Sequence, residues 1–173
     1  MMRKQSLFDK FRSTFTNARP SVGVLQIVGI DKNGRRKVLE EQNLVVNNAR
    51  HILSQLLGGK KAPAQAQKYF ITHMVMGDGV DPLNPSLPDP NSQFLINQRV
   101  KLEISSITFP SENSVKFVTL MDGETGNGVT FTEAGLIADN APSESEKMFA
   151  IKHHGGIRKS EELLLEYNWT IVF

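Results

Sequence analysis

The closing stretch of the chain, FAIKHHGGIRKSEELLLEYNWTIVF, places two adjacent histidines, His153 and His154, before two glycines, Gly155 and Gly156. Imidazoles are common metal ligands and acid–base groups, so a catalytic or metal site is the first hypothesis to test here. Neighbouring residues of a strand face opposite sides, so two adjacent histidines cannot easily ligate one metal. The chain has four histidines, and none has the H-E-x-x-H spacing of a zinc site. We therefore interpret the histidines as a strand end, the glycines as a chain reversal and the following RKSEE as its polar rim.

Two glycine-rich segments have the composition of calcium-binding loops. They are GDGVDP, with Asp78 and Asp81, and MDGETGNG, with Asp122, Glu124 and Asn127. Neither has the EF-hand pattern, so Asx turns between strands are the favoured interpretation. The serines lack an activating context such as G-x-S-x-G, and the absence of cysteine excludes disulfides and thiolate metal sites. The residues thus predict no catalytic group, no metal and no cofactor, and we expect the protein not to be an enzyme.

Composition places the chain among soluble globular proteins. Its 173 residues are 39% apolar and 22% charged, enough to bury the core of one ordinary domain. The net charge of +2 is too small to imply a nucleic-acid partner, and no apolar run reaches the ~20 residues that span a bilayer. We therefore expect neither nucleic acid nor membrane as a partner.

The elements expected around these segments are mostly strands. Two β-rich runs within residues 22–46 flank Asn33-Gly34, a strong hairpin signal, and residues 47–58 have the apolar stripe of a short helix. Further strands are expected in residues 69–77, 97–109, 113–121, 129–139, 147–153 and 162–173. One helix among about eight strands predicts a mainly β fold, an antiparallel β-sandwich occupying residues 21–173.

The first 20 residues have a different character, that of a basic amphipathic arm. Leu7, Phe8, Phe11 and Phe15 share one helical face, and Arg12 is one of five basic residues among residues 1–19, against one acidic residue. A short terminal helix is seldom stable without a surface to pack on. The arm is therefore expected either to fold back on its own domain or to dock in a groove on a neighbouring subunit.

A second candidate interface is the proline-rich stretch VDPLNPSLPDPN, which cannot form a helix or a central strand. Long loops of this kind in a compact domain are usually functional or interfacial, and a proline-stiffened loop loses little entropy on docking. We predict that this loop contacts partners through Pro82, Leu83, Pro85, Leu87 and Pro88.

Several motifs, in this order, resemble those of tailed-bacteriophage virion proteins. ITHMVMGDG and the Pro/Asp-rich loop after it resemble their I-x-x-[ML]-x-x-G-x-G strand and turn, and TFTEAGLIAD is similar to their [IV]-T-E-A-G-L-F strand. The closing segment resembles their pattern of a strand [ML]-F-A-R, a turn and a last strand ending W-x-[IL]-x-F. NLVVNNARHILSQLL fits the segment that follows their opening hairpin, and the resemblance covers roughly residues 22–173.

This resemblance implies a non-enzymatic structural component of a phage tail, baseplate, neck (collar) or fibre-attachment assembly. It implies that other phage structural proteins are the partners and that the chain forms a homo-oligomer. The expected location is the virion, assembled in the cytoplasm of the host bacterium.

Two other classes remain open from the residues. A host receptor- or carbohydrate-binding β-sandwich is the first, although sugar sites usually need exposed aromatic side chains. Trp169 and Tyr167 share the expected core face of the last strand, which disfavours that hypothesis. A metal hydrolase built on His153 and His154 is the least favoured class.

Overall fold

In the computed structural model, the described residues are 22–47, 49, 52–53, 69–138 and 147–173. The predicted arm, residues 1–20, and most of the predicted helix, residues 47–58, lie outside them. Of that helix, Ala49 and Ile52 are described and fully buried. No helix among the described residues is long and apolar enough to cross a bilayer.

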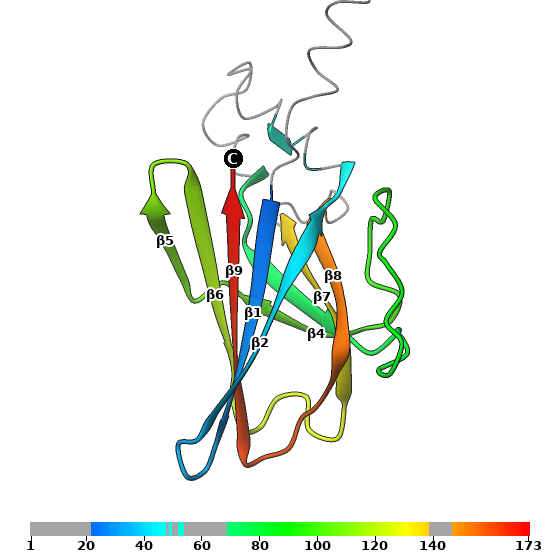
Figure 1. Ribbon diagram of the computed structural model, residues 1–173, viewed down its shortest axis with the longest axis vertical. Coiled ribbons are helices and arrows are strands. Elements are labelled where there is room, and N and C mark those ends of the chain that lie inside the picture. Colours follow the sequence, from blue (N-terminus) through cyan, green and yellow to red (C-terminus); the bar gives the residue numbers. More distant parts are fainter. Residues whose placement is uncertain (1–21, 48, 50–51, 54–68, 139–146) are drawn as a thin grey trace, which may run out of the picture.

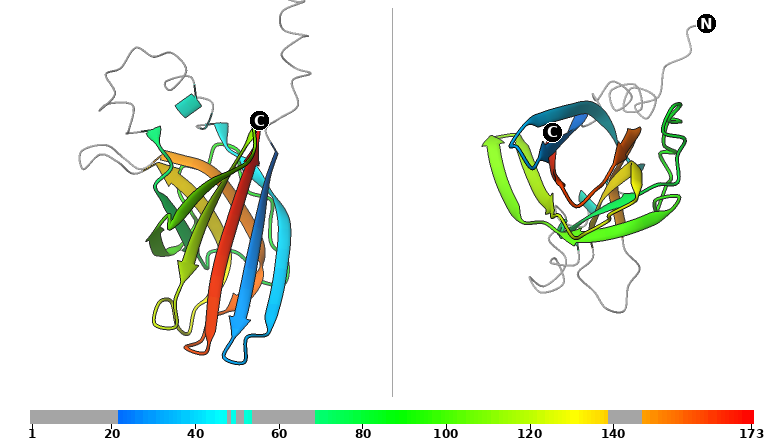
Figure 2. Two further views of the ribbon diagram at one scale, coloured as in Figure 1. Left: turned by 90° about the vertical axis from the view of Figure 1, so that its left-hand side faces the viewer. Right: turned by 90° about the horizontal axis from the view of Figure 1, so that it is seen from below.

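The described residues form a mainly β fold, as the sequence predicts, with nine antiparallel strands (Figures 1 and 2). In chain order the strands are β1 (Val22–Asp31), β2 (Arg36–Val45), β3 (His73–Gly77), β4 (Gln98–Glu103), β5 (Ser106–Ser111), β6 (Ser114–Met121), β7 (Thr130–Ala138), β8 (Lys147–Arg158) and β9 (Leu163–Val172). Their order across the sheet is β4-β3-β7-β8-β2-β1-β9-β6-β5.

These strands make one strongly curled half-barrel sheet, whereas the sequence predicts the two separate layers of a sandwich. The halves β4-β3-β7-β8 and β2-β1-β9-β6-β5 are joined by a short pairing of β2 with β8, Leu44 opposite Ile151 and Val45 opposite Ala150. Hydrogen bonding is therefore continuous from one edge to the other. The pattern of alternating apolar residues is the same for a sandwich and for a curled sheet, so it could not distinguish them.

The segment expected as one strand, residues 97–109, divides between the two edges of this sheet. β4 pairs with β3, and β5 pairs with β6 at the opposite edge. Between them, Ile104 N–H donates to the Thr72 carbonyl (2.9 Å) and Ser105 N–H donates to the Val118 carbonyl (2.8 Å). Two neighbouring residues thus bond to opposite halves, and this connection brings the two edges together.

The inner faces of both halves contribute to one apolar core. Its fully buried side chains include Leu25, Ile27, Met74, Met76, Met121, Phe131, Leu136, Tyr167 and Trp169. The alternation of the last strand predicts one inward face, which consists of Leu163, Leu165, Tyr167, Trp169, Ile171 and Phe173. This face is confirmed for Leu165, Tyr167, Trp169 and Ile171, which are fully buried, whereas the prediction is wrong for Phe173, which is 54% exposed. β9 lies between β1 and β6, so it is a central strand with no free edge for pairing with another subunit.

The predicted hairpin at Asn33-Gly34 is confirmed. β1 pairs with β2 from Gly23 opposite Asn43 to Ile30 opposite Arg36. Gly34 adopts a φ of 76°, which a side chain would disfavour, and its N–H donates to the Asp31 carbonyl (2.8 Å).

The interpretation of the His-His-Gly-Gly segment as a strand end and reversal is wrong. β8 continues through all four residues to Arg158, and the chain turns only at residues 159–162. The expected solvated rim is also wrong at Lys159, which is 1% exposed. Pairing with β7 on both sides explains the continuation, because Glu133 lies opposite His153 and Phe131 lies opposite Ile157. The register shifts between these two pairs, so the glycines lie in a β-bulge of a continuous strand.

Candidate interaction site at the proline-rich loop

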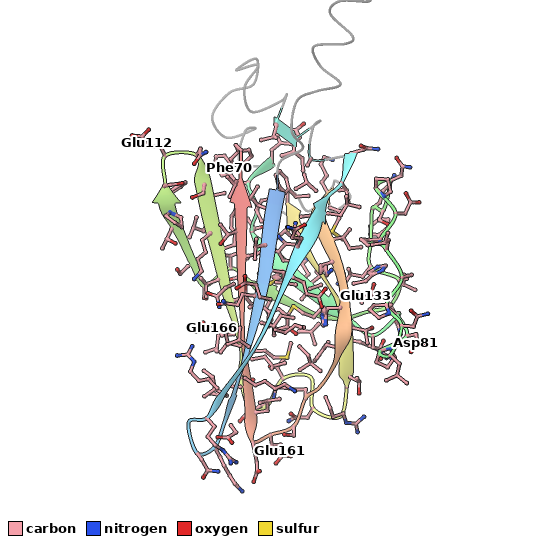
Figure 3. All side chains as sticks on the ribbon, in the orientation of Figure 1. Phe70, Asp81, Glu112, Glu133, Glu161 and Glu166 are labelled. Carbon is pink, nitrogen blue, oxygen red and sulfur yellow. The ribbon has the colours of Figure 1, made fainter. Side chains whose placement is uncertain are left out.

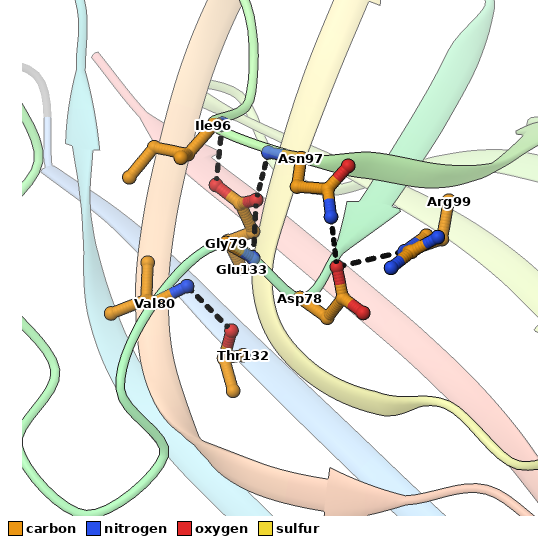
Figure 4. Close-up of polar contacts among 8 residues, drawn as sticks. All are labelled: Asp78, Gly79, Val80, Ile96, Asn97, Arg99, Thr132 and Glu133. Atoms are coloured by element: carbon orange, nitrogen blue, oxygen red, sulfur yellow. Dashed lines mark hydrogen bonds and ion pairs between the residues drawn. The ribbon is translucent and has the colours of Figure 1, made fainter.

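Glu133 on β7 holds both ends of the proline-rich loop, here defined as residues 78–97 (Figure 4). Its fully buried carboxylate accepts hydrogen bonds from the backbone N–H groups of Gly79 (3.0 Å), Ile96 (2.9 Å) and Asn97 (2.8 Å). A buried carboxylate needs such partners, because isolated burial of the charge is very costly. The carboxylate therefore brings the two ends of the loop together at one point.

Polar contacts beside Glu133 extend this clamp. The Thr132 hydroxyl accepts from Val80 N–H (3.1 Å), and the Asp78 carboxylate accepts from Asn97 Nδ2 (2.7 Å) and Arg99 Nε (2.8 Å) (Figure 4). The hydrogen bond and the charge of Asp78 raise the pKa of Arg99. Thr132 and Glu133, the first two residues of the segment TEAGL, therefore fix the base of the loop.

The proline-rich loop runs beside strand β8 (Figure 1), and the two are joined by several contacts. The His153 Nδ1 bonds the Ser86 carbonyl (2.9 Å), which makes Nδ1 the donor, and its Nε2 lies 3.9 Å from Glu133 Oε2. Gly156 N–H donates to the Pro82 carbonyl (3.3 Å). A Cβ at Gly156 would lie 2.6 Å from the Pro82 Cβ, so the glycine permits the close approach of the loop.

An apolar anchor completes the attachment. Leu95 is 6% exposed and belongs to a second apolar cluster, with Val46, Val75, Ile137, Met148 and Ile151. Val75 lies between Met74 and Met76, which face the main core, so this cluster lies on the outer face of the sheet. The loop therefore covers the outer surface of β3, β7 and β8.

The predicted interface residues of the loop lie mostly on its exposed side. Leu83 and Leu87 are 93% and 92% exposed, Pro82 and Pro85 are exposed, and Pro88 is half-buried. Sequence reasoning missed two further exposed apolar residues, Phe94 and Ile96. The predicted arm residues Leu7, Phe8, Phe11, Arg12 and Phe15 lie outside the described residues.

Sequence reasoning also missed Glu133 and Thr132 as the residues that position the loop. A signal was available, since Glu133 is the single charged residue within the otherwise uncharged run VTFTEAGLIA. A charge inside a strand that is buried along its length requires specific partners. The sequence could not say which groups these partners are, because they come from residues 79, 96 and 97.

His154 and Lys159 are also buried, and their hydrogen bonds go to residues outside the proline-rich loop. His154 Nδ1 bonds the Gly155 carbonyl (2.8 Å), and its Nε2 has no hydrogen-bond partner. Lys159 Nζ donates to Asn127 Oδ1 (3.1 Å) and to the Ser160 carbonyl (2.8 Å). Burial lowers the pKa of both groups. The two adjacent histidines thus have different surroundings, as expected for neighbours in a strand.

The predicted Asx turns are confirmed at Asp122 and Asp81, whereas the Asp78 carboxylate bonds the side chains of Asn97 and Arg99. Asp122 Oδ1 accepts from the N–H groups of Glu124 (3.1 Å) and Thr125 (2.8 Å), and Asp81 Oδ1 accepts from Leu83 N–H (2.9 Å). Hydrogen bonds from Thr125 lower the pKa of Asp122. Within the described part of the chain, no group of three histidine or acidic side chains is placed to hold a metal ion.

The large polar aromatic side chains are inside the molecule. Trp169 and Tyr167 are fully buried and Tyr69 is 4% exposed, and burial raises the pKa of the Tyr167 hydroxyl. The exposed aromatic side chains among the described residues are the phenylalanines Phe70, Phe94, Phe109 and Phe173. Phenylalanine has no polar group with which to orient a sugar hydroxyl, so these side chains fit apolar contacts better.

No protein-family model matches the chain, and no curated protein matches it.

Proposed function

We propose that the protein is a structural, non-enzymatic component of a tailed-phage virion and that it acts through subunit interfaces. The observation that carries the proposal is the proline-rich loop, which is fixed at its base and displays Leu83 and Leu87 almost fully to solvent. Single exposed leucines are ordinary, but two such residues on a clamped loop, with Phe94 and Ile96 also exposed, are typical of a contact surface.

The fixed base supports this role for a physical reason. Association immobilises side chains and loops, and that cost is smaller where the free protein already holds the bound conformation. Glu133, Thr132 and Leu95 each restrain the loop in the free chain. A restrained apolar loop therefore suits repeated contacts between identical or different virion subunits.

The phage assignment itself is supported by the order of the sequence motifs, whose residues have definite physical roles. In TEAGL, Thr132 and Glu133 bond the loop and Leu136 enters the core. A Cβ at Gly135 would lie 2.7 Å from the Sδ atom of Met148, so the glycine of this motif leaves room for that buried side chain. The expected partners are other phage structural proteins and further copies of the chain, in a virion assembled in the bacterial cytoplasm, with neither nucleic acid nor membrane as a partner.

Two measurements test this proposal. Light scattering across a range of concentrations is expected to show a homo-oligomer of the wild-type chain, or its binding to a second virion protein. Leu83→Ser/Leu87→Ser is expected to weaken that association at least tenfold without changing the melting temperature. Val38→Ser is the matched control. Val38 is also an exposed apolar residue (54% exposed), but it belongs to β2 and not to the loop.

The second measurement is mass spectrometry of purified particles of the phage that encodes the chain. Peptides of this protein are expected at the stoichiometry of a structural component. A monomer that binds no virion protein, or a chain missing from the particles, would contradict the proposal.

A further inference from the structure

An apolar groove lies at the end of the molecule where β9 terminates, apart from the proline-rich loop. It encloses about 420 Å³ and its lining includes Ile107, Phe109, Phe117, Phe149 and Phe173. Phe109 is 76% exposed and Phe173 is 54% exposed, whereas Phe117 and Phe149 are buried at its floor. Such a concentration of aromatic surface in a groove calls for an apolar occupant.

The start of β1 lies at the rim of this groove. Val22 pairs with Val172, and the residue that follows Val172, Phe173, lines the groove. Figure 3 shows Phe70 and Glu112, two other lining residues, at this same end of the molecule. Residues 1–21 therefore join the described domain beside the groove.

The composition of residues 1–20 matches the groove. Leu7, Phe8, Phe11 and Phe15 share one helical face, the amphipathic pattern that occupies hydrophobic grooves. The chain between Phe15 and Val22 can span up to about 25 Å when extended, so the arm has length to reverse toward the groove. The charge of the arm is basic, and the groove carries one acidic side chain, Glu112.

Chain connectivity favours the groove of the same chain over that of another. A tethered segment meets its own site at an effective concentration in the millimolar range, far above that of other copies in dilute solution. Residues 54–68 are a competing occupant, because they connect Leu53 and Tyr69, which also line the groove. Their large apolar side chains are limited to Leu56 and Leu57, so they fit the groove less well than the arm does.

We propose that the groove at the end of β9 binds the aromatic face of residues 1–20 of the same chain, with Phe8, Phe11 and Phe15 as the anchors. The arm then covers Phe109 and Phe173 and lies within cross-linking reach of position 112. This inference does not rest on the proposed function, because it concerns a different surface and an occupant within the chain.

Cross-linking tests the proposal, and the absence of cysteine makes the labels unique. Thr14→Cys/Glu112→Cys, treated with a short bis-maleimide at low protein concentration, is expected to give an internally linked monomer. Thr14→Cys/Glu161→Cys is the control, because Glu161 lies at the opposite end of the molecule (Figure 3). A covalent dimer, or linkage no more efficient than in the control, overturns the proposal.

A second variant tests the anchors in the full-length chain. Adding Phe11→Ser/Phe15→Ser to the Thr14→Cys/Glu112→Cys protein is expected to reduce linkage at least fivefold. The same change is expected to increase the fluorescence of the hydrophobic dye ANS several-fold, whereas Leu56→Ser/Leu57→Ser leaves linkage unchanged. Unaltered linkage in the phenylalanine variant, or loss in the leucine variant alone, overturns it. Failure here leaves the loop experiments unaffected, so the two proposals are tested separately.

Discussion

At the scale of single residues, one carboxylate replaces its lost hydration with three backbone donors. Glu133 is fully buried, and its two oxygens bond residues 79, 96 and 97 at 2.8–3.0 Å. Hydrogen bonds to a charged acceptor contribute more than neutral ones, and a donor left unpaired costs its full desolvation.

Glu133→Gln is therefore expected to lower the free energy of unfolding by about 2–4 kcal/mol. The amide keeps one acceptor oxygen and turns an NH₂ group toward backbone donors. Urea denaturation measures the loss, and Glu103→Gln, at an exposed position on β4, is expected to change stability by less than about 0.5 kcal/mol. Equal effects in the two variants would contradict the assigned role.

Gly155 and Gly156 make a matched pair for testing the contact of the loop with β8. A Cβ at Gly156 meets the Pro82 Cβ at 2.6 Å, whereas one at Gly155 meets only the Pro82 carbonyl oxygen at 4.0 Å. Gly156→Ala is expected to destabilise by about 1–3 kcal/mol through overpacking, and Gly155→Ala by less than about 0.5 kcal/mol. Thermal and urea unfolding of both variants check this, and the reverse order would contradict the close approach of the loop to Gly156.

His154 gives stability a dependence on pH. Burial lowers its pKa in the folded state below the ordinary value of 6.5. The hydrogen bond to the Gly155 backbone and the charge of Glu41 oppose this shift, while Lys152 and His153 reinforce it. The unfolded chain therefore binds more protons below about pH 6.5, so the contribution is complete above that pH and is lost as the pH falls.

The expected result is a free energy of unfolding that decreases between about pH 7.5 and pH 5.5, with a smaller decrease in His154→Gln. Urea denaturation at several pH values compares the two slopes, so any constant cost of the substitution cancels. Identical slopes would exclude His154 as a source of the pH dependence.

At the scale of elements, β9 is the strand on which the fold most depends. It pairs with β1 over Val22–Asp31 and with β6 over Ser114–Met121. Its inward residues Tyr167, Trp169 and Ile171 are fully buried. A central strand of this kind supplies both backbone ladders and core volume.

Deleting residues 169–173 is accordingly expected to give insoluble protein. The deletion removes backbone that pairs with β1 and β6, together with the buried side chains of Trp169 and Ile171. A buried Trp→Ala substitution alone lowers the free energy of unfolding by about 3–5 kcal/mol. Deleting Phe173 alone is the control and is expected to leave soluble protein, since Phe173 lies beyond β9 and is 54% exposed. Sedimentation of cell lysates and circular dichroism measure the outcomes. Soluble, folded protein from the longer deletion would refute the prediction.

At the scale of the whole molecule, the curl depends on the connection between β4 and β5. Ile104 bonds one half of the sheet through Thr72 and Ser105 bonds the other through Val118. The side chain of Ser105 also donates to the Val118 carbonyl (2.8 Å). Two adjacent residues therefore hold together edges that the short β2–β8 pairing alone would not bring into contact.

Ser105→Pro, which removes the backbone donor to Val118, is expected to destabilise the fold by about 3 kcal/mol or more. Ser105→Ala keeps that donor and is expected to cost about 1 kcal/mol, the contribution of one side-chain hydrogen bond. Urea unfolding of the two variants measures the difference. Similar values for both would show that the backbone bond at Ser105 does not hold the edges together.

Much of the secondary structure could be predicted from local pattern. Alternation identified the core face of β9, and Asn33-Gly34 identified the hairpin, because period-two patterning and positive φ are properties of short segments. The division of residues 97–109 escaped prediction, since a strand that leaves one edge for another keeps the same alternation. The reversal predicted at Gly155 and Gly156 is wrong for a related reason. Glycine permits a chain reversal and a close approach of another segment equally well, so its presence does not distinguish the two.

By itself, the sequence determined a mainly antiparallel β chain, the turns at Asn33-Gly34 and Asp122, and a proline-rich loop that cannot enter the sheet. Only the tertiary structure decided that the strands form one curled sheet, that Glu133 closes that loop and that Gly156 lies against Pro82. The physical reason is sequence separation. Alternation and turn chemistry act over a few residues, whereas Glu133 bonds partners 36 to 54 positions away, which no local pattern specifies.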